Sequence, residues 1–256
     1  MGRVTQQRPD HFGESVAARY DESQNAEFDP AVVARTVDFL ADAADGGPAL
    51  ELGIGTGRIA LPLAARGVPV HGIDLSTAMV ERLRGKPGGE RIGVTIGDFA
   101  TARAEGRFRL GYLVFNTIMN LTTQDAQVDV FRNVARHLEP GGRFVVEVMM
   151  PELRVLPPGQ SAVPFRTGPH GWAFDLYRVA TQQVSSNYIK VDEATGTGSA
   201  RSIPFRYVWP AELDLMARIA GMRLVERWAD WSRTPFGDES AKHVSVWRKD
   251  VVAGGD

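Results

Sequence analysis

Cysteine is absent from the 256-residue sequence. Without it the chain can form no disulfide framework, hold no zinc or iron–sulfur cluster through thiolates, and use no catalytic cysteine. An excess of positive charge is missing too, since 29 basic residues stand against 31 acidic residues. Nonspecific nucleic-acid binding depends on such an excess. We therefore expect no nucleic-acid partner.

Long apolar runs are also missing. The sequence has no run of about 18 apolar residues, the length that spans a bilayer as a helix. Residues 1–23 are polar and carry acids among their arginines, which is unlike a signal peptide or a transit peptide. We therefore expect a cytoplasmic protein with no membrane partner. The chain is long enough to bury a sizeable core without covalent crosslinks.

Apolar strands alternate with amphipathic helices between residues 29 and 150. The first helix is expected to begin at Asp29-Pro30, an N-cap followed by proline, and to end near Gly46-Gly47. Strands are then expected over 49–52, 70–73, 94–96, 110–115 and 143–148, with helices over 59–65, 77–83 and 123–138, the last stopped by Pro140-Gly141-Gly142. This order is typical of a doubly wound parallel α/β sheet.

Residues 151–209 interrupt that rhythm. Prolines crowd the start of this segment, and apolar residues then recur at every second position, as at Ile203, Phe205 and Tyr207, which indicates antiparallel strands. After Pro210 one more helix and strands over 223–228 and 243–247 are expected. We therefore divide the chain into an N-terminal cap (1–28), a core (29–150), an antiparallel β insertion that caps the active site (151–209) and a part that completes the core (210–256).

A glycine-rich turn between an expected strand and an expected helix is the most informative segment. Gly53, Gly55 and Gly57 permit a sharp turn and let a ligand approach backbone N–H groups that a Cβ would shield. The dinucleotide pattern G-x-G-x-x-G would place its third glycine at position 58, which is Arg58, and the Gly-Lys-Ser/Thr of a P-loop is missing. Glu51 stands two residues before the first glycine.

The resulting pattern E-x-G-x-G-x-G resembles motif I of the class I S-adenosylmethionine-dependent methyltransferases. Three further segments match in the family's order: residues 70–76, residues 96–99 and residues 138–143. The matches cover about residues 47–149. The resemblance implies a Rossmann-like sheet and S-adenosyl-L-methionine as cofactor, with S-adenosyl-L-homocysteine as product.

The resemblance also implies which residues contact the cofactor. The glycines would line its methionine part, Glu51 would act through its ammonium or through the turn, and Asp74 would hold the ribose. The remaining contacts would be Leu75 and Met79 on the adenine, Asp98 and Phe99 at its far edge, and Tyr20, Arg58 and Asn116. Two of these residues, Met79 and Arg58, have more than one possible role. Met79 could be helix core, and Arg58 could pair with the methionine carboxylate or be a solvated residue of the first turn.

Three residues are candidates for the reaction itself: Asn116, Tyr20 and His170. Asn116 follows the fourth strand, whose carboxyl end should face the reacting methyl group. The Asn/Asp-Pro-Pro-Tyr/Phe motif of DNA and protein-glutamine methyltransferases is not found there. Tyr20 lies in a segment that would fold over the cofactor, or it is a docking aromatic. His170 lies in the proline- and glycine-rich first part of the insertion and is the candidate base, because the ordinary pKa of histidine is near neutral.

These residues predict direct methyl transfer to nitrogen or oxygen of a small-molecule acceptor. The five histidines are scattered, so no metal site is expected. The insertion after the fifth strand resembles the arrangement in sugar N,N-dimethyltransferases of antibiotic pathways and in glycine N-methyltransferases. A nicotinamide-dependent oxidoreductase and a non-catalytic cofactor-binding protein are the alternatives. The expected state is a monomer or a homodimer.

Overall fold

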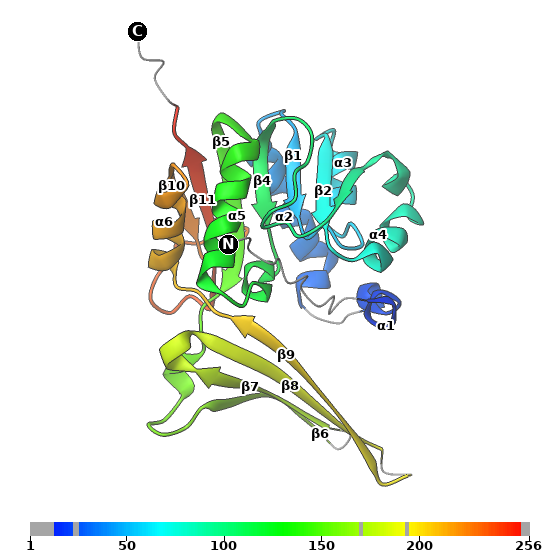
Figure 1. Ribbon diagram of the computed structural model, residues 1–256, viewed down its shortest axis with the longest axis vertical. Helices are drawn as coiled ribbons and strands as arrows, with labels where there is room; N and C mark the ends of the chain where they lie inside the picture. Colours follow the sequence, from blue (N-terminus) through cyan, green and yellow to red (C-terminus); the bar gives the residue numbers. More distant parts are fainter. Residues whose placement is uncertain (1–12, 23–25, 169–170, 193–194, 252–256) are drawn as a thin grey trace, which may run out of the picture.

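The computed structural model describes residues 13–22, 26–168, 171–192 and 195–251, and these residues form two sheets (Figure 1). The larger sheet has seven strands and the smaller has four. Helices flank the larger sheet, and the smaller sheet lies beyond the carboxyl ends of its parallel strands (Figure 1). None of the helices in the described residues is long and apolar enough to cross a membrane.

The seven-stranded sheet has the order β10-β11-β5-β4-β1-β2-β3. Its strands are β1 (Ala49–Leu52), β2 (Val70–Asp74), β3 (Gly93–Ile96), β4 (Phe108–Leu113), β5 (Leu138–Met149), β10 (Met222–Trp228) and β11 (Lys242–Lys249). The first five run parallel, and β11 pairs antiparallel with both β5 and β10. The direction of winding reverses between β1 and β4, the place where ligands bind in open α/β sheets. The predicted doubly wound sheet is confirmed.

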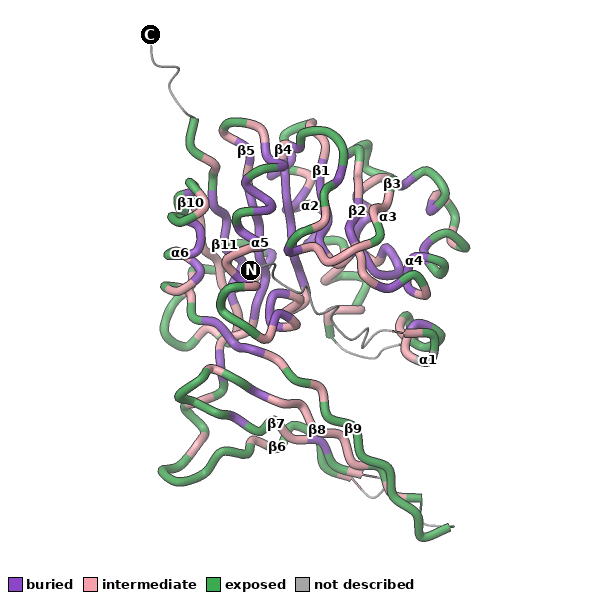
Figure 2. The backbone as a smooth tube through the Cα atoms, in the orientation of Figure 1, coloured by how far each residue is buried: buried purple, intermediate pink, exposed green. Residues whose placement is uncertain are grey.

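Helices cover both faces of this sheet. They are α2 (Pro30–Ala44), α3 (Ala60–Ala65), α4 (Thr77–Arg84), α5 (Gln124–His137) and α6 (Pro210–Ile219), preceded by the short α1 (Glu14–Ala17). Phe131 of α5 and Met216 of α6 share one apolar cluster with Trp247, whereas Leu40 of α2 lies in a second cluster with Tyr112. The strands between these layers are mostly buried (Figure 2).

Helices α2 and α5 begin where a side chain accepts a hydrogen bond from one of their first free N–H groups. The carboxylate of Asp29 accepts from the N–H of Ala31 at 2.7 Å, as the N-cap position predicts. The hydroxyl of Thr123 caps α5 in the same way, at 3.2 Å from the N–H of Ala126. These two caps place the starts of α2 and α5 within one residue of where the sequence pattern indicates them.

The four-stranded sheet is an antiparallel meander in the order β6-β7-β8-β9. Its strands are β6 (Ala162–Gly168), β7 (Gly171–Arg178), β8 (Gln183–Asp192) and β9 (Thr197–Arg206). Its outer strands β6 and β9 are mostly exposed, whereas most residues of β7 and β8 are partly or fully buried (Figure 2). We call this sheet the lid.

The end of β4 and the start of β5 differ from the sequence prediction for a physical reason. β4 ends at Leu113, because Phe115 and Asn116 adopt left-handed conformations with φ of 58° and 57°, which a strand cannot continue through. β5 begins at Leu138 and includes Pro140-Gly141-Gly142, which we expected to be only a helix stop. Gly141 has a φ of 78°, and the pairing with β4 shifts register between Phe108 and Leu110. An irregular strand start therefore replaces the expected loop.

Candidate active site

The glycine turn joins β1 to α3 and is fastened to the end of β2. The N–H of Gly53 donates to the carbonyl of Ile73 at 2.8 Å, and the N–H of Gly55 donates to Oδ2 of Asp74 at 2.7 Å. The N–H of Gly57 donates to the carbonyl of Ile54 at 3.0 Å. All three N–H groups thus have acceptors inside the protein, and the glycines provide the shape of the turn. That they line the methionine part of the cofactor stays a prediction.

The need for glycine is conformational and steric at once. Gly53, Gly55 and Gly57 have φ values of 72°, 54° and 77°, a region that side chains disfavour. A Cβ on Gly53 would come within 2.9 Å of Cγ2 of Thr117, which lies after β4. A Cβ on Gly55 would lie 3.3 Å from the methyl group of Met79. The turn is therefore packed between the segment after β4 and the first turns of α4.

Asp74 ends β2 and holds the turn in place. Its Oδ1 accepts from the N–H of Ser76 at 2.8 Å while its Oδ2 binds Gly55. The carboxylate is half-buried and lies at the carboxyl end of β2, one strand away from the switch point of the sheet. Its orientation is fixed from both sides by backbone donors, which prearranges an acceptor for hydroxyl groups.

Glu51 lies beneath the turn and is 3% exposed. Its Oε2 accepts a hydrogen bond from the hydroxyl of Tyr112 at 2.9 Å. Burial raises the pKa of Glu51 to about 8, although the Tyr112 hydrogen bond and the nearby charge of Arg58 oppose the rise. Burial also raises the pKa of Tyr112 well above its ordinary value. Glu51 is therefore mostly protonated at neutral pH.

Arg58 is enclosed by aromatic rings. Its guanidinium carbon lies 5.0 Å from the ring centroids of both Phe28 and Phe115. The same guanidinium donates to the backbone carbonyl of Glu27. The interpretation of Arg58 as a solvated residue of the first turn is therefore wrong, because the side chain clamps the N-terminal segment onto the core. Pairing with a carboxylate of the cofactor stays a prediction.

The N-terminal segment lies over the glycine turn through further polar contacts. Oδ1 of Asp21 accepts from the hydroxyl of Thr56 at 2.6 Å, and its Oδ2 pairs with Nζ of Lys86 at 2.7 Å. Lys86 also donates to the backbone carbonyl of Thr56 at 2.8 Å. None of these three contacts could be predicted, because single polar residues far apart in sequence carry no recognisable pattern.

Tyr20 reaches the same place from the N-terminal segment. Its ring packs edge-on against Phe28, with centroids 5.4 Å apart. Burial raises the pKa of Tyr20 to about 12, although Arg58 acts in the opposite direction. A narrow cavity of about 30 Å³ lies here, lined by Tyr20, Glu51, Gly53, Ile54, Gly55, Thr56, Arg58, Ile59, Val114, Phe115 and Thr117. The structure thus brings five of the predicted cofactor residues to one cavity.

The segment after β4 is tied to β5 by two hydrogen bonds. Oε2 of Glu147 accepts from the N–H of Phe115 at 3.1 Å, and Oδ1 of Asn116 accepts from the N–H of Met149 at 2.7 Å. Glu147 is 4% exposed, and its Oε1 accepts from Nε1 of Trp231 at 3.0 Å and from Lys242 at 2.8 Å. These bonds hold two left-handed residues in place, and strain of this kind gathers at functional sites. The role of Glu147 was not predicted.

The other predicted residues surround the end of β3 and the start of α4. Asp98 accepts from the N–H of Ala100 at 2.9 Å, and Phe99 is half-buried beside the glycine turn. Leu75 is half-buried, whereas Met79 is 3% exposed, so Met79 is helix core and also borders the turn. His170 lies outside the described residues.

Comparison with known proteins identifies the family to which this chain belongs. A family model described as a methyltransferase domain matches residues 49–142. The solved CcbJ methyltransferase from Streptomyces caelestis is 36% identical to this chain, with a TM-score of 0.81 over 93% of this chain and 98% of that one.

Two further proteins extend the comparison. The cypemycin N-terminal methyltransferase from a Streptomyces species is 26% identical over 205 residues, which are 79% of this chain and 83% of that protein. CalS10, an amino pentose methyltransferase from Micromonospora echinaspora, shares the fold, with a TM-score of 0.63 at 20% identity over 95% of this chain and 100% of that one.

The chain belongs to the class I S-adenosylmethionine-dependent methyltransferases. It is an enzyme whose cofactor is S-adenosyl-L-methionine, as the sequence motifs predict. The glycine turn, with its positive φ angles and its closely packed neighbours, and the fixed carboxylate of Asp74 fit this cofactor. The predictions of family, fold and cofactor are confirmed, and the two alternative classes are set aside.

Proposed function

We propose that this enzyme transfers a methyl group to an amine nitrogen of a small-molecule acceptor. The observation that carries the proposal is the protonation state of Tyr20 in the cavity. Burial raises the pKa of Tyr20 to about 12, so its hydroxyl keeps its proton at neutral pH. Tyr20 therefore offers the acceptor no general base. A neutral amine needs none, whereas an alcohol must lose its proton in order to attack.

The printed names of similar proteins support an amine. The 26% identical relative is by name an N-terminal methyltransferase, which points to an amine acceptor. Proteins of the same fold include an amino pentose methyltransferase, a sugar N-methyltransferase and a glycopeptide N-methyltransferase. Their acceptors are small or peptide amines. We infer an acceptor of that chemical class for this chain.

The cofactor supplies an activated methyl group on a sulfonium sulfur, so the protein must mainly align the reactants and exclude water. We propose that Asp74 holds the ribose hydroxyls, that Leu75, Met79, Asp98 and Phe99 hold the adenine, and that the glycine turn with Glu51 and Arg58 receives the methionine part. Tyr20 and Asn116 then border the reacting methyl group. The clamp of Arg58 between Phe28 and Phe115 keeps the N-terminal segment closed over it.

The bound cofactor would supply its methyl group to the lone pair of the amine nitrogen, and its sulfur would keep the electron pair of the broken carbon–sulfur bond. The nitrogen would then carry the positive charge and release a proton to solvent. The neutral Tyr20 hydroxyl suits this step, because it offers lone pairs to an N–H donor without a charge that would tighten binding of the starting sulfonium. His170 stays the predicted base for an alcohol acceptor.

Transfer of tritiated methyl groups from labelled S-adenosyl-L-methionine tests the proposal. The acceptors are matched pairs: an amino pentose with its parent pentose, and an alanine-initiated tripeptide with its N-acetyl form. We expect label only in the members with a free amine. Label in the pentose or in the N-acetyl peptide would overturn the proposal.

A further inference from the structure

Helix α5 carries a buried amide that joins the lid to the core. Gln127 is 0% exposed. Its Nε2 donates to the backbone carbonyl of Ile118 at 3.2 Å and to that of Arg206 at 3.1 Å, and its Oε1 accepts from the Arg206 guanidinium. Every polar atom of the side chain is therefore used. Two of the three bonds go to the last residue of the lid, and the third goes to the core.

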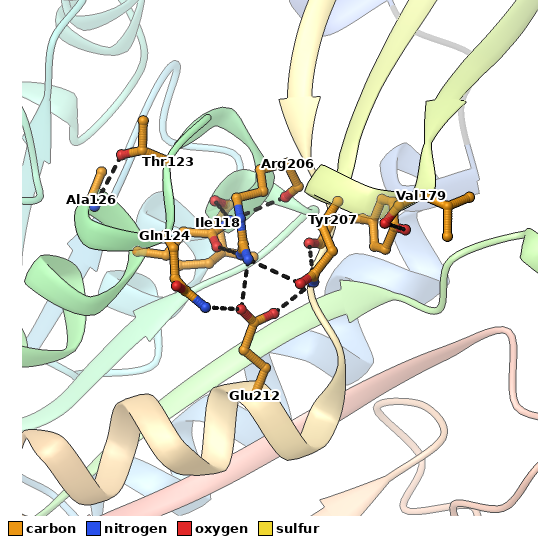
Figure 3. A network of polar contacts seen from close by, with 10 residues as sticks. Ile118, Thr123, Gln124, Ala126, Val179, Arg206, Tyr207 and Glu212 are labelled. Atoms are coloured by element: carbon orange, nitrogen blue, oxygen red, sulfur yellow. Dashed lines mark hydrogen bonds and ion pairs between the residues drawn. The ribbon is translucent and has the colours of Figure 1, made fainter.

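A charged network reinforces the lid end of this junction (Figure 3). The guanidinium of Arg206, 5% exposed, donates to Oε1 of Glu212 at 2.6 Å and to Oε1 of Gln182 at 3.1 Å. Gln124 and Gln182 each donate to Glu212 at 2.8 Å. Burial acts to raise the pKa of Glu212, but these hydrogen bonds outweigh it and lower the pKa. The pair is thus ionised and held in one geometry.

The core end of the junction lies next to the reaction site. Ile118 belongs to the 3-10 turn Thr117–Asn120, which directly follows Asn116. Thr117 of that turn packs against Gly53. Gln127 therefore connects the last strand of the lid with the turn that borders both the glycine turn and the predicted catalytic Asn116.

A second buried amide on the same helix reaches the other side of the site. Asn133, six residues after Gln127, is 1% exposed. Its Nδ2 donates to the carbonyls of Phe99 at 3.0 Å and Ala102 at 2.8 Å, in the loop after β3. The N–H of Ala104 in the same loop donates to Nε2 of His137 at 3.1 Å. Helix α5 thus contacts the lid through Gln127 and the loop after β3, where we predict that the adenine binds, through Asn133.

We propose that Gln127 is a positioning residue that sets the lid over the catalytic edge and thereby governs acceptor binding, whereas Asn133 positions the cofactor side. An apolar side chain at position 127 would remove the amide donor to the carbonyls of Ile118 and Arg206 and the acceptor of the Arg206 guanidinium. The lid would then move independently of the turn at Ile118. The cofactor contacts on the far side of α5 would be unaffected.

The test compares Gln127→Met with Asn133→Leu, two substitutions that keep the approximate volume and remove one buried amide each. Hydrogen exchange is measured on complexes with S-adenosyl-L-homocysteine, whose affinity is measured by calorimetry. For Gln127→Met we expect about tenfold faster exchange in residues 117–120 and 197–206, and an affinity within about twofold of wild type. For Asn133→Leu we expect the reverse: wild-type exchange in the lid and an affinity at least about fivefold weaker.

A second readout rests on the proposed function and uses the amino pentose as the acceptor probe. With Gln127→Met its KM should rise about tenfold while the KM for the cofactor stays constant. Gln127→Glu keeps the acceptor for Arg206 and should restore part of the lid protection, which also covers the case that the methionine variant fails to fold. Two outcomes would overturn the inference. One is wild-type lid exchange in both Gln127→Met and Gln127→Glu, and the other is an equal loss of cofactor affinity in Gln127→Met and Asn133→Leu. If the amino pentose is not methylated by wild type, the proposed function fails for this probe and the exchange data decide the inference alone.

Discussion

The hydroxyl of Tyr112 donates to the carboxyl group of Glu51 at 2.9 Å, and both side chains are buried beneath the glycine turn. Burial raises the pKa of Glu51 to about 8. If the cofactor's ammonium approaches this carboxyl group, as the family resemblance implies, it favours the ionised form. Cofactor binding should therefore expel the proton of Glu51.

This proton release is measurable. At pH 7 a group with a pKa of about 8 is about nine-tenths protonated, so wild type should release close to one proton per S-adenosyl-L-homocysteine bound. Calorimetry in buffers of different ionisation enthalpy reports the number directly. Glu51→Gln should release almost none. Equal release by the two proteins would show that Glu51 does not respond to the ligand.

The same pKa shift makes stability depend on pH. The pKa of Glu51 is raised in the folded protein from 4.5 to about 8, so its stabilising effect is complete below pH 4.5 and is lost as pH rises through 8. The free energy of unfolding of wild type, measured with urea, should fall between pH 6 and pH 9. Glu51→Gln should lose clearly less over the same range, and parallel curves would contradict this account.

Asp74 should be essential for the cofactor. Asp74→Ala removes the acceptor for Gly55 and Ser76 and, on our proposal, for the ribose hydroxyls. Each hydrogen bond to a charged group contributes about 1.5–3 kcal/mol, so affinity for S-adenosyl-L-homocysteine should fall at least about 100-fold. Asp38→Ala, a change at an exposed acid on α2, is the control and should bind like wild type. Unchanged affinity of Asp74→Ala would place the ribose elsewhere.

The clamp of Arg58 predicts an effect on the N-terminal segment. Arg58→Ala removes the contacts with both Phe28 and Phe115, and cation–π contacts contribute about 0.5–2 kcal/mol each. Hydrogen exchange in residues 14–22 and 26–28 should accelerate, while exchange in α5 stays the same. Arg66→Ala, which removes an exposed arginine just after α3, is the matched control and should leave the segment protected.

Glu147 should stabilise the strained segment after β4. Glu147→Gln weakens the bonds to Phe115, Trp231 and Lys242, and we expect a loss of about 1–3 kcal/mol in the free energy of unfolding. Urea titration measures it. Glu81→Gln, on the exposed side of α4, should change stability by less than about 0.5 kcal/mol. A loss no larger than this control would mean that the bonds of Glu147 do not support the turn.

The sheet and the position of its ligand site could be predicted because their signals are local. Asp29-Pro30 starts a helix, and an acid two residues before three spaced glycines marks the cofactor turn. The left-handed pair Phe115 and Asn116 could not be predicted, because tertiary bonds from β5 hold it and because phenylalanine disfavours that conformation, although asparagine tolerates it.

The contacts between distant segments were likewise beyond the sequence. Arg58 is adjacent to the motif, yet its environment comes from Phe28 and Phe115, which lie 30 residues before it and 57 after it. Gln127 reads as one more polar residue on an amphipathic helix. Only the packing of the lid on α5 shows that it is buried and fully bonded. Pairings of this kind depend on the tertiary arrangement, which periodicity does not encode.

The identity of the bond that the enzyme makes tests the central claim most directly. Wild type is incubated with S-adenosyl-L-methionine carrying a ¹³C methyl group and with an amino pentose carrying ¹⁵N, and the product is examined by NMR. We predict a one-bond ¹³C–¹⁵N coupling in the new methyl group. A labelled methyl group bonded to a hydroxyl oxygen of the same molecule, with no such coupling, would contradict the proposed methylation of an amine.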